Sequence, residues 1–166
     1  MLRKFTPIYL AAVITSQLVT FIPCKSSVED MERVSLFFVD RQMMRLIETE
    51  YYISSASPEK QAEMVIEQLL EGKDENETVR RMLPAESDAI NVYVKGDIAY
   101  IDINEKYIDS YETGKNQEQL IIYQLVNSVA SVDGISRIKF LFDGESKKDF
   151  LGEIDMREAF IPDYSV

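Results

Sequence analysis

The sequence contains no histidine, no tryptophan and a single cysteine, Cys24. Without histidine, the Ser-His-Asp and Cys-His nucleophile systems are excluded, as are the catalytic zinc sites that depend on imidazole. One cysteine excludes an internal disulfide, a cysteine-rich zinc site and an iron–sulfur cluster. Six glycines and five prolines among 166 residues exclude collagen-like and low-complexity chains. Carboxylates, hydroxyls, Lys, Arg and Tyr are the side chains left for chemistry.

Basic residues are also scarce, with 18 Lys and Arg against 29 Asp and Glu, which gives a formal net charge of −11. Phosphate backbones repel a chain of this charge, because no release of counterions favours the complex. The sequence therefore predicts that nucleic acid is not a partner. A hydrophobic fraction of 46% and a charged fraction of 28% indicate a globular chain, and the length allows one ordinary domain.

The first 24 residues have the pattern of an export signal. Arg3 and Lys4 precede 19 uncharged, mostly apolar residues, Phe5–Pro23, which is close to the roughly 20 residues that span a bilayer. A positive charge before a long apolar run is typical of a secretory signal, and it keeps the N-terminus cytoplasmic while the rest of the chain lies outside. A buried helix of the domain is the alternative interpretation of the run. The polar stretch that follows the run argues against this alternative.

Cys24 stands where the apolar run ends, as in a bacterial lipobox, in which the cysteine is lipidated and becomes the mature N-terminus. Pro23 occupies the position where Gly, Ala or Ser is usual. Two modes of attachment stay open: a lipid on Cys24, or an uncleaved N-terminal helix. Loss of residues 1–23 removes Arg3 and Lys4 and leaves 16 basic against 29 acidic residues, so the exported part carries −13.

Residues 25–33 are polar and predict a tether, residues 34–160 predict one domain, and residues 161–166 predict a tail. Within the domain, Val34–Val39 is a β-rich run and Arg45–Ile53 is a second strand candidate. Ser57 followed by Pro58 suits an N-cap and a first helical residue. The apolar spacing after them predicts an amphipathic helix that ends at Gly72, with Ala62, Val65, Ile66, Leu69 and Leu70 on its buried face.

The clearest local signal is a hairpin over Ile90–Ile103, preceded by a charged loop at residues 73–87 that could hold a short helical turn. Apolar and polar residues alternate on both strands, and Gly96-Asp97 suits a type II′ turn. One face of the hairpin is apolar. The other face carries tyrosines and an acid, Tyr93, Tyr100 and Asp102.

A second helix is predicted over Gln117–Val132, with Asn116 as its N-cap and Gly134 as its end. Its wide apolar face indicates that it packs against a sheet. Ile138–Phe142 predicts a strand closed by an Asp143-Gly144 turn, and residues 150–154 predict a further short strand. The order gives an α/β (α+β) fold, a two-layer sandwich with a mixed sheet and two helices on one face.

The order and spacing of these segments resemble the GerMN domain, the sporulation and germination module of GerM-type proteins, over roughly residues 34–160. The matching pieces follow the chain: Val34–Asp40 as the opening strand, Val65–Gly72 as the helix ending in Leu-Leu-x-Gly, Leu83-Pro84 and Ile90–Asn104 with the ending Ile101-Asp102-Ile103-Asn104, Gln119–Ser128 as the Gln-Leu-Val-x-Thr-type helix with Ser128 for Thr, and Ile138–Glu145 as the closing strand and turn.

GerM itself is similar to two such domains in tandem, whereas this chain has one, as in related single-copy envelope lipoproteins. The resemblance implies a ring-building-motif-like fold. It also implies an extracytoplasmic role without established enzymatic chemistry, and it implies no cofactor.

The candidate interaction surface consists of exposed tyrosines and a neighbouring acid, since tyrosine favours interfaces. Its members are Tyr93, Tyr100, Asp102, Tyr107 and Tyr111. No catalytic residue and no metal ligand is predicted. The Ser57–Lys60 spacing matches the Ser-x-x-Lys nucleophile motif but is interpreted as a helix cap, because the supporting motifs are missing.

Three functions follow, in order of preference. The first is a membrane-tethered, extracytoplasmic, non-catalytic domain that acts in protein assembly, with envelope proteins or copies of itself as partners. The second is a module that binds peptidoglycan or another wall polymer. The third is a wall hydrolase with paired carboxylates. Its candidates are the acids that follow the hairpin, Asp102, Glu105 and Asp109, together with Asp143 and Glu145 on another turn.

Overall fold

The computed structural model describes residues 30–72, 79–80, 82–83, 89–107, 115–147 and 154–166. The elements follow the order β1 (Met31–Asp40), β2 (Leu46–Ser54), α1 (Pro58–Glu71), β3 (Val79–Arg80), β4 (Ile90–Lys95), β5 (Ile98–Ile103), the 3₁₀ helix η1 (Glu105–Tyr107), α2 (Lys115–Val129) and β6 (Arg137–Phe142). The strands form two sheets, β2-β1-β3 and β4-β5-β6.

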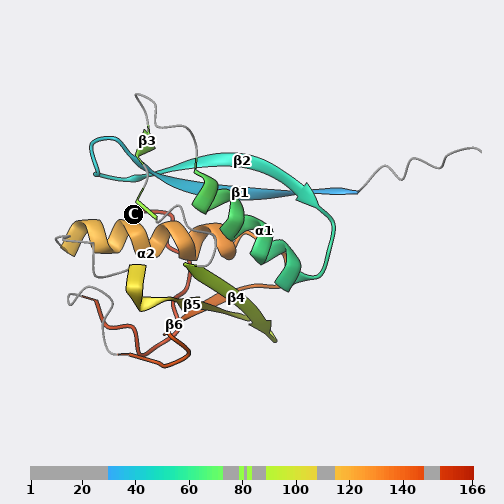
Figure 1. The fold of residues 1–166 in the computed structure, drawn as a ribbon. Helices are drawn as coiled ribbons and strands as arrows, with labels where there is room; N and C mark the ends of the chain where they lie inside the picture. Colours follow the sequence, from blue (N-terminus) through green and yellow to red (C-terminus); the bar gives the residue numbers. More distant parts are fainter. Residues whose placement is uncertain (1–29, 73–78, 81, 84–88, 108–114, 148–153) are drawn as a thin grey trace, which may run out of the picture.

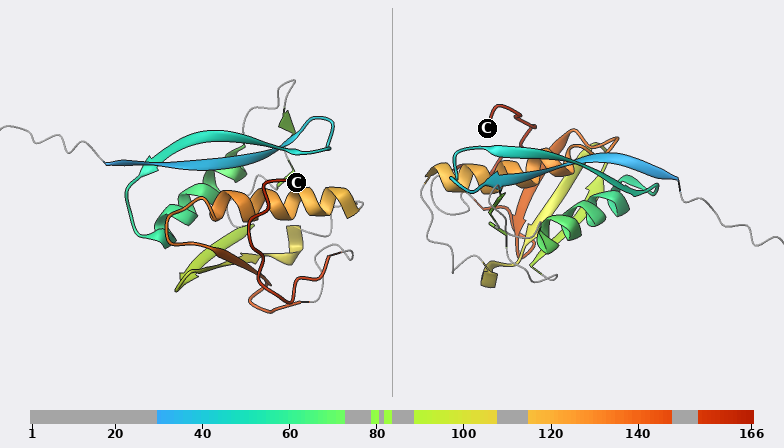
Figure 2. Two further views of the ribbon diagram at one scale, coloured as in Figure 1. Left: turned by 180° about the vertical axis from the view of Figure 1, so that it is seen from behind. Right: turned by 90° about the horizontal axis from the view of Figure 1, so that it is seen from above.

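Both helices lie between the two sheets (Figure 1), and the two further views agree (Figure 2). The helices share one face of β4-β5-β6, and β1 and β2 cover the side of the helices that faces away from that sheet. The apolar core draws on both sheets and both helices. The predicted α/β class with a mixed sheet and two helices on one face is confirmed. The sequence pattern did not separate the strands before α1 from the later sheet. In the structure these strands form a sheet of their own.

In the first sheet, β1 pairs with β2 along nine residues in antiparallel register, from Met31 with Ser54 to Val39 with Leu46. The predicted strand Val34–Val39 is therefore present and starts three residues earlier, inside the stretch expected to be a tether. The other edge of β1 pairs with β3 only at Val39 and Asp40. The strand β3 lies where the sequence predicted a loop with, at most, a helical turn.

Helix α1 has the predicted ends. The Ser57 hydroxyl accepts the N–H of Lys60 at 3.4 Å, and Pro58 is the first helical residue. At the other end Gly72 has φ 69°, a conformation that L side chains rarely adopt, and its N–H donates to the Gln68 carbonyl. The residues predicted for the apolar face are all buried.

The hairpin β4–β5 is confirmed, with Tyr93 opposite Tyr100. Gly96 has φ 66° at the first turn position. Asp97, at the second position, is not among the described residues with positive φ. This combination is that of the predicted type II′ turn. Strand β6 lies parallel to β5, and α2 provides the crossover between them.

Helix α2 starts and ends earlier than predicted. It begins at Lys115, so Asn116 lies inside the helix instead of capping it, and it ends at Val129, five residues before Gly134. Ten residues between Glu118 and Val129 are buried, including Glu118, Gln124, Asn127 and Ser128. A helix packed against one sheet would bury one face. The burial extends around α2 because it has a sheet on each side.

The turn of the hairpin is fixed to the start of β6 by an ion pair. Arg137 donates to both carboxylate oxygens of Asp97, at 3.1 Å from Nε and 2.8 Å from Nη2, and the Ser136 hydroxyl donates to the same group at 2.6 Å. Arg137 first and Ser136 second hold the pKa of Asp97 well below its ordinary value of 3.8.

Replacing Asp97 with asparagine is expected to remove an acid-dependent part of the stability. Because the folded-state pKa lies below the unfolded value, the carboxylate stabilises the fold above about pH 4, and this contribution disappears as the pH falls through the folded-state pKa. Urea titrations from about pH 7 to pH 2 should therefore give a difference between wild type and D97N that is constant near neutrality and shrinks in acid. Asp133→Asn, in an exposed neighbouring turn, is the control, and an equal difference at all pH values would contradict the assignment.

Candidate functional site

The side of β1 that faces away from β2 is closed by two serine hydroxyls, one from Ser128 in α2 and one from Ser131 just after α2. The Ser128 hydroxyl, which is fully buried, accepts the N–H of Phe37 at 2.9 Å. The Ser131 hydroxyl accepts the N–H of Ser35 at 3.0 Å and lies 3.1 Å from the Ser35 carbonyl. These side chains bind the backbone as a neighbouring strand would, over the part of β1 that β3 does not reach. An edge closed in this way offers fewer free backbone groups to a foreign strand.

The C-terminal segment crosses the same region. The Asn127 side chain exchanges two hydrogen bonds with the backbone of Asp163: its amide donates to the carbonyl at 2.8 Å, and its oxygen accepts the N–H at 3.0 Å. The Tyr164 ring lies 5.6 Å from the Phe37 ring, centroid to centroid. The Ser165 hydroxyl and N–H donate to the Asp163 carboxylate and lower its pKa. The residues predicted to form a tail, 161–166, thus pack on α2 and β1.

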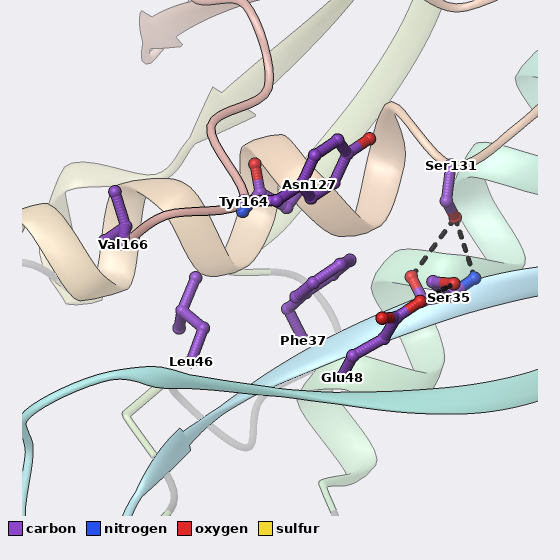
Figure 3. Close-up of a pocket in the computed structure, with 8 residues that line it drawn as sticks. All are labelled: Ser35, Phe37, Leu46, Glu48, Asn127, Ser131, Tyr164 and Val166. Carbon is purple, nitrogen blue, oxygen red and sulfur yellow. Dashed lines mark hydrogen bonds between the residues drawn. The ribbon is translucent and has the colours of Figure 1, made fainter.

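These elements enclose a cavity of about 430 Å³ (Figure 3). Phe37 and Leu46 point from the strands toward the C-terminal segment, where Tyr164 and Val166 complete the apolar part. The remaining lining residues are polar: Ser35, Glu48, Asn127 and Ser131. The combination of an aromatic pair, a carboxylate and an amide suits a sugar or an amine.

Three members of the candidate interaction surface meet on the outer face of β4–β5. The rings of Tyr93 and Tyr100 stack with centroids 4.9 Å apart and planes inclined by 2°. Tyr93 is 42% exposed. Partial burial, with Asp102 and Tyr100 beside it, raises the pKa of the Tyr93 phenol.

The other members of that surface are placed differently. Tyr107 lies in η1, partly buried against the core, with the Lys106 ammonium 4.4 Å from its ring centroid. Tyr111 and Cys24 lie outside the described residues. The structure therefore brings together Tyr93, Tyr100 and Asp102 and places Tyr107 apart from their stack.

Two of the carboxylates considered for hydrolysis, Asp102 and Glu105, form structural contacts. Asp102 accepts the N–H of Gly144 at 2.9 Å and so fixes the Asp143-Gly144 turn. Glu105 forms an ion pair with Lys147. Asp109 lies outside the described residues, as do most of the residues predicted to form a strand at 150–154.

Among the described residues, no helix is long and apolar enough to cross a bilayer, and residues 5–23 lie outside this part of the chain. No group of three or more potential metal-ligating side chains occurs in the same part of the chain.

Sequence reasoning did not find the cavity or the contacts of Asn127, Ser128 and Ser131. A signal was present, because Asn127 and Ser128 are small polar residues on the apolar stretch of α2 and become buried. A buried polar side chain needs a hydrogen-bond partner. The pattern could therefore have indicated that α2 faces backbone groups, though not which ones.

Comparison with known proteins places these features in context. The family model Germane, described as "Sporulation and spore germination", matches residues 35–148. No curated protein sequence matches.

Three solved structures are similar in fold. A "Putative Lipoprotein" from Clostridium perfringens has a TM-score of 0.56 at 20% identity, covering 81% of this chain and 89% of that one. The first GerMN domain of the sporulation protein GerM from Bacillus subtilis has a TM-score of 0.55 at 19% identity, covering 75% and 92%. The tandem GerMN domains of the same protein give 0.56 at 16% identity, covering 78% of this chain and 46% of the tandem.

Proposed function

The chain belongs to the GerMN (Germane) family of sporulation and spore germination domains, and from that premise we propose that it is a non-catalytic assembly domain. It is tethered to the membrane on the outer side and binds another envelope protein. In a host that forms spores, it acts in sporulation or germination. The N-terminal pattern that ends at Cys24 and the similarity in fold to a "Putative Lipoprotein" support the tether.

The observation that carries the proposal is the stacked pair of Tyr93 and Tyr100 beside Asp102 on the outer sheet face. Tyrosines at protein interfaces combine apolar area with a hydroxyl and lose little conformational entropy on binding. The stack holds both rings in place before a partner arrives, which reduces the entropy lost on binding further.

Replacing Tyr93 with alanine is expected to weaken capture of the partner from membranes about tenfold or more, the size of effect typical of a central aromatic residue at an interface. The measurement is a pull-down from membranes with the full chain, together with size-exclusion chromatography of residues 25–166. Tyr52→Ala, which removes an exposed tyrosine from β2, is the matched control. A monomeric domain that captures no protein, or equal capture by Y93A and wild type, would contradict the proposal.

A second candidate function is the binding of a cell-wall polymer, and the cavity favours it. The rings of Phe37 and Tyr164, the Glu48 carboxylate and the Asn127 amide line one opening of about 430 Å³. Peptidoglycan offers sugars and amines, which this lining suits.

If the cavity binds wall polymer, Tyr164→Ala is expected to lower the fraction of chain that sediments with purified cell wall by about fivefold, the loss typical of one aromatic contact. Because the exported part is strongly acidic, little non-specific binding is expected. Tyr52→Ala again serves as control, and no sedimentation of the wild type would exclude this second function.

A further inference from the structure

Among the residues that the structure describes, strand β4 is an edge of its sheet, since the order β4-β5-β6 leaves one of its sides without a strand. In an antiparallel pair, alternate residues turn both backbone groups toward the partner strand. The Ala89 carbonyl accepts the N–H of Asn104, on the β5 side. The N–H of Val94 points the other way and donates to the Glu59 carboxylate at 2.9 Å. By this alternation, Ile90 and Val92 also turn their backbone groups away from β5.

Helix α1 runs antiparallel alongside this edge and leaves a groove. Its first turn meets the end of β4 through Glu59 and Val94, and its later turns meet the start of β4. Between them lies a space of about 190 Å³, lined by Glu63, Ile66, Glu67 and Leu70 of α1 and by Ile90, Asn91 and Val92 of β4. The floor of the groove is apolar and one wall carries carboxylates.

The charges of the groove specify the occupant. Glu67 is exposed, and within the described part of the chain it has no ion-pair partner; Glu63 forms an ion pair with Lys60. A second copy of the domain would bring further carboxylates to this wall. Its own β4 edge lies beside the same Glu63 and Glu67, and its β2 strand carries Glu48 and Glu50. Like charges placed opposite each other are destabilising. A basic segment would instead place positive charges opposite these carboxylates.

The spacing of the carboxylates fits an extended chain. Glu63 and Glu67 are one helical turn apart, about 6 Å along the axis. Alternate side chains of a strand are about 6.6 Å apart and point to the same side. Two basic residues at positions i and i+2 of an added strand would therefore each meet one carboxylate, with their aliphatic stems over Ile66 and Leu70.

We propose that an extended, basic segment of a partner protein adds to the sheet as a strand beside β4. Its backbone pairs with Ile90 and Val92, and its alternate Lys or Arg side chains bind Glu63 and Glu67. The proposal rests on the assembly function above and names the chemistry of the partner. Backbone pairing supplies affinity in such complexes, and the alternate side chains supply specificity.

The probe is a fluorescein-labelled peptide with lysine at alternate positions, Lys-Val-Lys-Val-Lys, titrated by fluorescence anisotropy with the full chain in detergent micelles. We expect saturable binding that weakens at least about fivefold in the double variant E63Q/E67Q, which loses two exposed ion pairs. The double variant E50Q/E145Q removes the same charge from other surfaces and is expected to bind as wild type does. Equal weakening in both variants would show attraction by net charge alone and would overturn the proposal.

A second measurement tests the strand pairing itself. In the chain labelled with ¹⁵N-valine, saturating peptide is expected to slow hydrogen exchange at the Val92 amide at least about fivefold while leaving that of Val126, in α2, unchanged. Binding without protection of Val92, absence of binding, or self-association through this edge would each overturn the proposal. If the peptide fails to bind while Tyr93→Ala still weakens capture of the partner, the assembly function stands and its surface is the tyrosine face instead.

Discussion

Replacing Phe140 with alanine is expected to lower the free energy of unfolding by about 3–5 kcal/mol. Phe140 is fully buried in β6 and is among the largest such side chains in the described residues. It pairs with Ile101 of β5 and packs at right angles to Phe160, with ring centroids 5.5 Å apart. Phe160 packs in turn on Tyr123 of α2 at 6.1 Å. Removing the ring therefore leaves a cavity where sheet, helix and C-terminal segment meet.

Urea unfolding followed by far-UV circular dichroism measures this effect, since the chain has no tryptophan for fluorescence. Phe140→Leu keeps most of the volume and should lose less than half as much stability as Phe140→Ala. A loss under about 1 kcal/mol in F140A would mean that the surroundings collapse onto the site, which contradicts close packing of Phe140 in the core.

Replacing Ser128 with alanine is expected to destabilise the fold by about 1–3 kcal/mol, although only one oxygen atom is removed. The Phe37 N–H that the hydroxyl accepts lies in the buried part of β1. In the alanine variant this donor has lost both water and its acceptor, and a buried, unpaired N–H carries its full desolvation penalty. The effect should also appear as faster hydrogen exchange at the Phe37 amide.

Two variants control this experiment. Ser128→Thr keeps the hydroxyl and should recover most of the stability, in line with the threonine of the family's motif. Ser131→Ala removes the hydroxyl beside Ser35, where the contact is only partly buried, so a smaller loss is expected. Equal stability of S128A and wild type would show that this contact does not hold β1 against α2.

Local sequence signals predicted the parts of the fold that neighbouring residues determine. Ser57, Pro58 and Gly72 set the ends of α1, and Gly96 set the turn of the hairpin, because caps and tight turns depend on backbone conformation within a few residues. The same signals misjudged α2, where Asn116 suited a cap but the helix starts at Lys115. The predicted and observed starts differ by two residues, which is the range over which helix ends commonly vary.

For the candidate site, the sequence alone predicted the outward-facing tyrosines of the hairpin, since alternation along a strand fixes which residues share a face. It also excluded histidine-dependent catalysis, an internal disulfide and a cysteine-rich metal site, and it predicted the GerMN family from the order of its elements. What it could not predict is the cavity, the closed edge of β1 and the open edge of β4. The contacts of Ser128 with Phe37 and of Ser131 with Ser35 join residues 91 and 96 positions apart. Such pairings arise only when two sheets close around the helices, and only the tertiary structure decides which backbone groups are then covered and which remain for a partner.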